Sequence, residues 1–152
     1  GPDGTREFAV EDMCTAPGQN QLKRGEMLVS INFPTPEPGS GAHYMRFIPR
    51  NEMDIAVAGA GVSVVLDNGT LKEARVALAS VAPTPLFVRE AGASLAGKPA
   101  NEESVQKAAE IARDAAKPIT DMRGTMEYRR HLCEVLTRRA LNIAIQRAKE
   151  TR

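Results

Sequence analysis

A two-residue turn near the middle of the chain constrains the fold more than any other feature. Asn68-Gly69 stands between two apolar stretches, residues 55–66 and 71–81, which are rich in valine, leucine and alanine. Asn-Gly readily takes the positive φ angles of a type I′ turn, whose twist matches that of two paired strands. We therefore expect these two stretches to form an antiparallel hairpin.

Further strands are indicated before the hairpin. Residues 16–20 are turn material, and residues 42–48 form a candidate strand. In residues 26–33 apolar side chains recur at every second position: Met27, Val29, Ile31 and Phe33. That alternation is typical of a strand with one buried face. The proline- and glycine-rich run 34–41 then predicts a loop or a boundary between subdomains.

Helical signals fill the rest of the chain. Residues 85–91 are a candidate short helix. Asn101 suits the N-cap of a helix that ends at Ala116, and Thr125 suits the N-cap of a last helix over residues 126–149. The first of these helices carries a stripe of mainly small residues, expected to allow close packing on a sheet: Val105, Ala108, Ala109, Ile111, Ala112 and Ala115. The last helix has an apolar side: Leu132, Val135, Leu136, Leu141, Ile143, Ala144 and Ile145.

The order of these elements predicts the fold class. Strands come first and helices second, which is typical of an α+β fold. We expect an antiparallel sheet of three to four strands, followed by about three helices packed on one face of it.

Composition excludes several classes of function. The formal net charge of +1 gives no global field for nucleic acid or an anionic membrane. No apolar run is long enough to span a bilayer, and no signal peptide opens the sequence. Cys14 and Cys133 are expected to be reduced, structural thiols, which indicates a cytoplasmic protein.

No conventional catalytic set is recognisable. His43 and His131 lie far apart, and neither has cysteines or carboxylates at metal-ligand spacing, so no metal site is predicted. The glycine-rich run 58–61 lies inside a strand pattern, without the following helix that a phosphate-binding loop needs. We interpret it as a packing feature, such as a bulge or a close approach of the backbone.

The last helix is rich in basic residues: Arg129, Arg130, Arg138, Arg139, Arg147, Lys149 and Arg152. They favour a solvated helix face that meets partner proteins. A non-enzymatic α+β interaction domain that docks through this helix is therefore an alternative function. An RNA-binding fragment is a weaker alternative, because no aromatic residues interleave with the basic ones to stack on bases.

Three motifs carry a resemblance to a known family. The first, residues 22–34, contains Gly25-Glu26-Met27-Leu28. The second, residues 44–56, runs from Tyr44-Met45-Arg46 to Asp54-Ile55-Ala56. The third, residues 119–130, contains Asp121-Met122-Arg123 and Tyr128-Arg129-Arg130. In this order they resemble the FAD-binding (medium) subunit of the xanthine dehydrogenase and carbon monoxide dehydrogenase family, the molybdenum hydroxylases. The resemblance covers essentially the whole chain and corresponds to the C-terminal portion of that subunit.

The resemblance implies a domain organisation and a function. Residues 1–34 would be the tail of the second FAD-binding subdomain, and residues 41–152 a domain like the C-terminal domain of CO dehydrogenase flavoprotein. FAD would pass electrons from iron–sulfur clusters to an acceptor. A partner iron–sulfur subunit would hold the 2Fe-2S clusters, and another partner subunit the molybdenum cofactor. The main pyrophosphate-binding part is missing from these residues, so we expect the chain alone to be inactive as an oxidoreductase.

Two residues are expected at the flavin. By the resemblance, Leu28 packs on the flavin ring, and Arg46 takes the place of a basic residue near the ring's polar edge. A cation there stabilises an anionic reduced flavin. Arginine keeps the charge of the lysine that the family often has, but changes its geometry.

Overall fold

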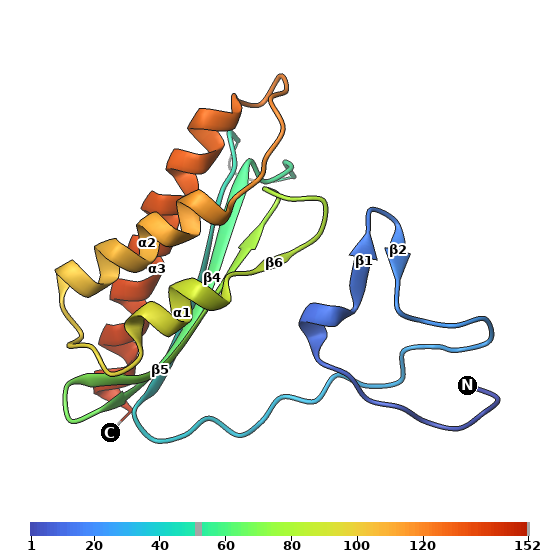
Figure 1. Cartoon of the computed structure of the whole chain (residues 1–152), viewed down its shortest axis with the longest axis horizontal. Helices are drawn as coiled ribbons and strands as arrows, with labels where there is room; N and C mark the ends of the chain where they lie inside the picture. Colours follow the sequence, from blue (N-terminus) through green and yellow to red (C-terminus); the bar gives the residue numbers. More distant parts are fainter. Residues whose placement is uncertain (51–52, 152) are drawn as a thin grey trace.

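The computed structural model describes residues 1–50 and 53–151, which form an N-terminal arm and a sheet domain. The N-terminal arm, residues 1–33, contains the 3-10 helix η1 (Val10–Asp12) and a small hairpin of β1 (Cys14–Ala16) and β2 (Gln19–Asn20). Figure 1 shows the arm apart from the helices, with the strands of the sheet domain between them. The turn predicted at residues 16–20 is confirmed, with Gly18 at a φ of 71°.

The sheet domain begins with an antiparallel meander. It consists of β3 (Ser40–Phe47), β4 (Ala58–Asp67), β5 (Thr70–Ala79) and β6 (Leu86–Phe87), in the spatial order β3-β4-β5-β6. The Asn68-Gly69 hairpin is confirmed: the two residues have φ angles of 49° and 82° and join β4 to β5. The irregularity in this pair of strands lies between Val65 and Leu66 and not at the glycines of β4.

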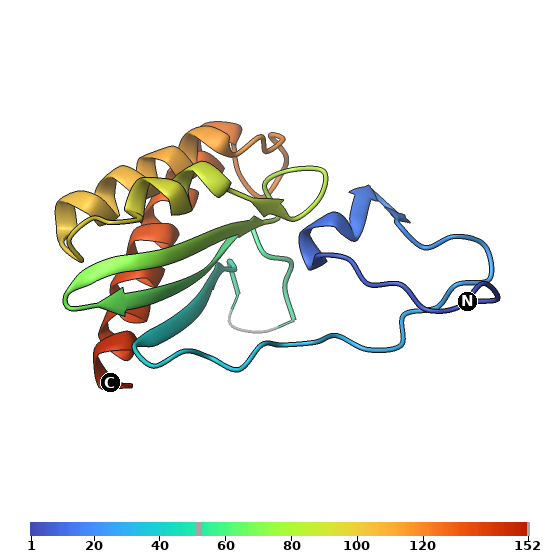
Figure 2. The ribbon, with the colours of Figure 1, turned by 60° about the horizontal axis from the view of Figure 1, so that its bottom comes forward.

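Three helices follow in the described part of the chain. They are α1 (Arg89–Leu95), α2 (Glu102–Ala115) and α3 (Met126–Glu150). Both predicted caps are present: the side chain of Asn101 accepts a hydrogen bond from the backbone N of Ser104, and that of Thr125 from the N of Tyr128. Figures 1 and 2 show the helices gathered beside one face of the sheet, so the predicted α+β arrangement is confirmed.

Close backbone approaches set how the helices lie on the sheet. A Cβ atom on Gly41 of β3 would lie 2.1 Å from the carbonyl oxygen of Ala144 in α3. A Cβ on Gly92 of α1 would lie 2.3 Å from the carbonyl oxygen of Ala74 in β5. Helix α2 packs mainly against α1 and α3, so its small-residue stripe serves helix–helix contacts rather than the predicted contact with the sheet.

Two predicted elements were wrong. Residues 85–91 do not form one helix, because Leu86 pairs with Leu78 and Phe87 with Ala77 before α1 begins at Arg89. Residues 26–33 are not a strand with a buried face, and Phe33 is 87% exposed. No strand runs beside 26–33 within the described residues, so its alternating side chains have no surface to pack on.

Candidate functional site

The face of the sheet that the helices leave uncovered carries one of the predicted site residues. We call this side the open face. Met45 and Phe47 of β3 pack against the core, so the alternating Tyr44 and Arg46 lie on the open face. Arg46 is exposed there and is paired in register with Gly59 of β4.

The glycines of β4 make room for the ring of Tyr44 on the open face beside Arg46. A Cβ atom on Gly59 would lie 2.8 Å from the Oη atom of Tyr44, and one on Gly61 would lie 3.5 Å from the ring of Tyr44. The tyrosine ring therefore occupies the space that side chains on β4 would fill. The interpretation of residues 58–61 as a packing feature is confirmed, and the close approach comes from a side chain.

The loop that follows β3 contains an ion pair from the second motif. The Nε atom of Arg50 donates to Oδ2 of Asp54 over 3.4 Å, and the backbone N of Ile55 donates to Oδ1 over 2.8 Å. Burial of Asp54 acts to raise its pKa, but these hydrogen bonds outweigh burial and the net pKa is lowered. Asp54 thus stays ionised beside the end of the strand that carries Arg46. Both residues belong to the second motif, but their pairing was not predicted from the sequence.

Leu28 lies in the arm and not on the sheet. It is 55% exposed and lines a cavity of about 450 Å³ between residues 1–13 and 22–32 of the arm. Every residue that lines this cavity belongs to the arm. Leu28 and Arg46 therefore do not share one cavity in this chain, although each offers the chemical group expected of it: an accessible apolar side chain and an accessible cation.

Glu26, two residues before Leu28, holds the arm together. Arg6 donates to both carboxylate oxygens of Glu26, over 2.9 Å from Nε and 2.8 Å from Nη2. The backbone N of Lys23 donates to Glu26 as well, over 2.6 Å. The hydrogen bonds from Arg6 and then Lys23 lower the pKa of Glu26 to about 2. Glu26 was part of the first motif, but its role could not be predicted from the sequence, because its partner Arg6 lies twenty residues away.

The third motif ties α3 to the sheet through Arg129. This side chain is 5% exposed; its Nη1 donates to the carbonyl oxygens of Val57, over 3.1 Å, and of Ser80, over 3.3 Å. Its Nη2 donates to Oδ1 of Asp121 over 2.6 Å. A hydrogen bond from the backbone N of Arg123, and then Arg129 itself, lower the pKa of Asp121. Asp121 and Arg129 therefore join the loop before α3 to the ends of β4 and β5.

The neighbours of Arg129 in this motif make further contacts within the chain. The ring of Tyr128 meets that of Phe47 edge to face, with centroids 6.1 Å apart. Arg130 donates to the carbonyl oxygens of Arg113 and Asp114 at the C-terminal end of α2. Three consecutive side chains thus connect the first turns of α3 to β3, to the ends of β4 and β5, and to α2.

The interpretation of α3 as a basic docking helix is only partly supported. Arg129 is buried and Arg130 is bound to α2; Arg138 lies 3.7 Å from Glu102, and Arg147 donates to the carbonyl oxygen of Ala42. Arg152 lies outside the described residues. Arg139 and Lys149 are exposed. Internal hydrogen bonds and ion pairs therefore account for much of the charge that had favoured a partner or RNA.

Two kinds of feature are absent from the described residues. No described helix is long and apolar enough to cross a membrane. Nor do three or more histidine, cysteine, aspartate or glutamate side chains cluster in the described part of the chain in a way that could hold a metal ion.

The sheet with its layer of helices forms an α+β domain, and this domain contains the second and third motifs. Residues 43–144 match the family of the CO dehydrogenase flavoprotein C-terminal domain. The chain belongs to this family.

Similar proteins extend this match to the arm. The chain is 35% identical to the carbon monoxide dehydrogenase medium chain of Afipia carboxidovorans, over 98% of this chain and 51% of that relative. It is 29% identical to the putative xanthine dehydrogenase FAD-binding subunit of Escherichia coli K12, over 97% of this chain and 51% of that relative. The chain thus spans about half the length of these relatives.

Solved structures agree with the sequence matches. A carbon monoxide dehydrogenase from Hydrogenophaga pseudoflava, which lacks the Mo-pyranopterin moiety of its molybdenum cofactor, is similar over 97% of this chain and 51% of that chain. The TM-score is 0.92 and the identity 33%. A reconstituted CO dehydrogenase from Oligotropha carboxidovorans gives a TM-score of 0.90 at 33% identity, over 97% of this chain and 51% of that chain.

Proposed function

We propose that this chain is the C-terminal part of the FAD-binding electron-transfer subunit of a molybdenum hydroxylase. The observation that carries the proposal is the match of nearly the whole chain, arm included, to a carbon monoxide dehydrogenase medium chain and to a xanthine dehydrogenase FAD-binding subunit. On this proposal residues 1–34 are the tail of the second FAD-binding subdomain, and residues 41–152 are the C-terminal domain.

The residues of this chain fit the ring of the flavin better than its pyrophosphate. Leu28 offers an apolar surface and Arg46 a cation, and both are accessible. The N-terminal ends of the helices do not suit an anion, because Glu90, Glu102, Glu103 and Glu127 occupy their first turns. We therefore place the pyrophosphate on a part of the complete subunit outside these residues.

The proposed chemistry is that of the cofactor. Bound FAD would take electrons from 2Fe-2S clusters on an iron–sulfur subunit and pass them to an acceptor, while a further subunit holds the molybdenum cofactor. Within this chain, Leu28 would orient the ring by covering part of one face. Arg46 would stabilise negative charge at the polar edge of the ring. A cytoplasmic location, without nucleic acid as a partner, belongs to the same proposal.

A titration with FAD tests this function. The 152-residue chain should bind FAD weakly or not at all, because one apolar contact and one charge give roughly millimolar affinity or weaker once the entropy of association is counted. The complete subunit should bind FAD tightly. In the complete subunit, Leu28→Ala should weaken binding or shift the flavin absorption bands, whereas Phe33→Ala, at an exposed apolar residue of the arm outside this cavity, should do neither. Micromolar binding by the short chain, or none by the complete subunit, would contradict the proposal.

A further inference from the structure

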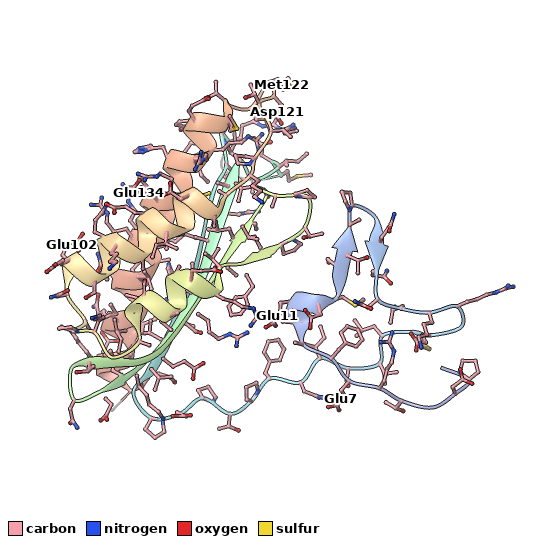
Figure 3. The ribbon with its side chains drawn as sticks, viewed as in Figure 1. Glu7, Glu11, Glu102, Asp121, Met122 and Glu134 are labelled. Carbon is pink, nitrogen blue, oxygen red and sulfur yellow. The ribbon has the colours of Figure 1, made fainter. Side chains whose placement is uncertain are left out.

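Glu11 joins the arm to the sheet domain. Its Oε1 atom accepts a hydrogen bond from Nη2 of Arg75 in β5 over 3.2 Å, and Nη2 of Arg89 in α1 lies 3.5 Å from the same oxygen. The Glu11 side chain is 15% exposed, whereas both arginines are about half exposed or more. In Figure 3, Glu11 lies on the side of the arm nearest the sheet domain, and Glu7 lies further along the arm.

The sheet domain arranges the two arginines for this contact. The guanidinium carbon of Arg75 lies 4.4 Å from the centre of the Phe87 ring, and that of Arg89 lies 4.6 Å from it. Cation–π attraction to one ring therefore holds two like charges close together. A carboxylate between them relieves their mutual repulsion, and Glu11 supplies it from the arm. The hydrogen bond of its own backbone N–H, and then the charges of the two arginines, keep the pKa of Glu11 low against the effect of burial.

Within the arm, the position of Glu11 is linked to that of Leu28. Residues 6 and 11 belong to the same short stretch of chain, and Arg6 is joined to Glu26 by two hydrogen bonds, two residues before Leu28. The covalent connection from the arm to β3 runs instead through residues 34–39, which contain Pro34, Pro36 and Pro38. Such a proline-rich connector acts as a semi-rigid spacer, so it sets the separation of the two parts more than the angle between them.

We propose that Glu11 is a positioning residue, which fixes the arm on the sheet domain through Arg75 and Arg89 and so sets where Leu28 lies relative to Arg46. The proposal rests on the proposed function only for its consequence at the flavin. The contact between arm and sheet domain is independent of any cofactor, and it can be tested separately.

The first test compares Glu11→Gln with Asp12→Asn in the complete subunit. Asp12 is a matched control, because it is an exposed carboxylate of the same 3-10 helix as Glu11 and lies outside the cavity that Leu28 lines. Without FAD, amide hydrogen exchange in residues 9–16 and 86–92 should become about two to ten times faster in Glu11→Gln, as expected for losing exposed ion pairs. High salt should reduce the difference from the unmodified protein. Equal exchange in both variants would overturn the proposal.

The second test reads the flavin. With FAD bound, Glu11→Gln should raise the dissociation constant and shift the absorption bands, while Asp12→Asn should leave both unchanged. Glu11→Asp, which keeps the carboxylate on a shorter side chain, should retain more exchange protection and flavin binding than Glu11→Gln, and an unchanged circular dichroism spectrum of Glu11→Gln should exclude a loss of folding. Faster exchange in Glu11→Gln with unaltered flavin binding would overturn the positioning role. Faster exchange in a complete subunit that binds no FAD would overturn the proposed function and leave the contact of Glu11 standing.

Discussion

The Nη2 atom of Arg129 donates to Oδ1 of Asp121 over 2.6 Å, and the Nη1 atom of the same guanidinium reaches the carbonyl oxygens of Val57 and Ser80. One buried cation thus satisfies acceptors from the start of β4, the end of β5 and the loop before α3. A buried guanidinium needs such partners, because an unpaired one would be costly to desolvate. The pair is labelled at Asp121 in Figure 3, at the end of the domain where α3 begins.

Replacement of Arg129 should therefore destabilise the fold. Arg129→Leu leaves the carbonyl groups of Val57 and Ser80 without this donor and should lower the free energy of unfolding by about 2–4 kcal/mol. Arg139→Leu, at an exposed position of the same helix, should change it by less than about 0.5 kcal/mol. Urea unfolding followed by circular dichroism measures both. Equal stability of the two variants would contradict the role of Arg129.

The arm should lose stability in acid through Glu26. Its pKa falls from 4.5 to about 2 in the folded chain, so its ionised form is favoured by folding. This contribution is complete above pH 4.5 and is lost as pH falls through about 2. Glu26→Gln should accordingly speed hydrogen exchange in the arm at neutral pH, and the difference should shrink on acidification. Asp3→Asn serves as the control. A difference that grows on acidification would have the wrong sign.

The hairpin prediction depends on backbone conformation alone. Gly69 has a φ of 82°, and a Cβ atom placed on it would have no atom beyond its chain neighbours within 4 Å. Gly69→Val should lower the free energy of unfolding by about 1–3 kcal/mol, because a β-branched residue takes positive φ at a cost. Gly69→Asn should cost less, since asparagine tolerates this region. Thermal unfolding that is the same for valine and wild type would contradict the turn.

Local signals explain why so much of the fold could be predicted. The turn at Asn68-Gly69 and the caps Asn101 and Thr125 act on residues next to them in sequence, so their effects were readable without a structure. The strand β6 was missed because its pairing with Leu78 is a tertiary contact that overrides the local pattern. Residues 26–33 were predicted wrongly for the opposite reason. Their apolar side chains alternate as in a strand, but the described residues offer no neighbouring strand or surface for that side to pack on.

The site was less predictable than the fold. Leu28 and Arg46 came from a resemblance, and their contact with a flavin stays a prediction. Arg129 was taken for part of a solvated face because charge on a helix usually faces water, and only its distant acceptors reveal its burial. Glu11 gave no signal, since its partners lie more than sixty residues away.

The apolar side of α3 should carry more stability than its arginines. Leu136 is buried in the core, whereas Arg138 is half-buried and lies 3.7 Å from Glu102. Leu136→Ala should cost about 2–5 kcal/mol through lost burial and a cavity. Arg138→Glu should leave the fold intact, because exposed ion pairs contribute little. Chemical denaturation of both variants is the measurement. If Arg138→Glu unfolded the protein and Leu136→Ala did not, the helix would have to face the other way.

Not every predicted apolar position of this helix is in the core: Val135 and Ile143 are only half-buried.

The charge of Arg46 should be visible in the reduction potential of bound flavin. Reduced flavin is anionic, so a nearby cation stabilises it relative to the oxidised ring. In the complete subunit, Arg46→Ala should lower the two-electron midpoint potential by about 30 mV, which corresponds to about 1.4 kcal/mol. Arg46→Lys keeps the charge and should recover most of the loss, although a lysine cannot reproduce the geometry of a guanidinium. Arg139→Ala, on exposed surface of α3, controls for the general effect of removing a positive charge. Spectroscopic redox titration of the three variants provides the measurement. A lysine variant as low in potential as the alanine variant would show that charge at this position does not act on the flavin, and an unchanged alanine variant would remove Arg46 from the site.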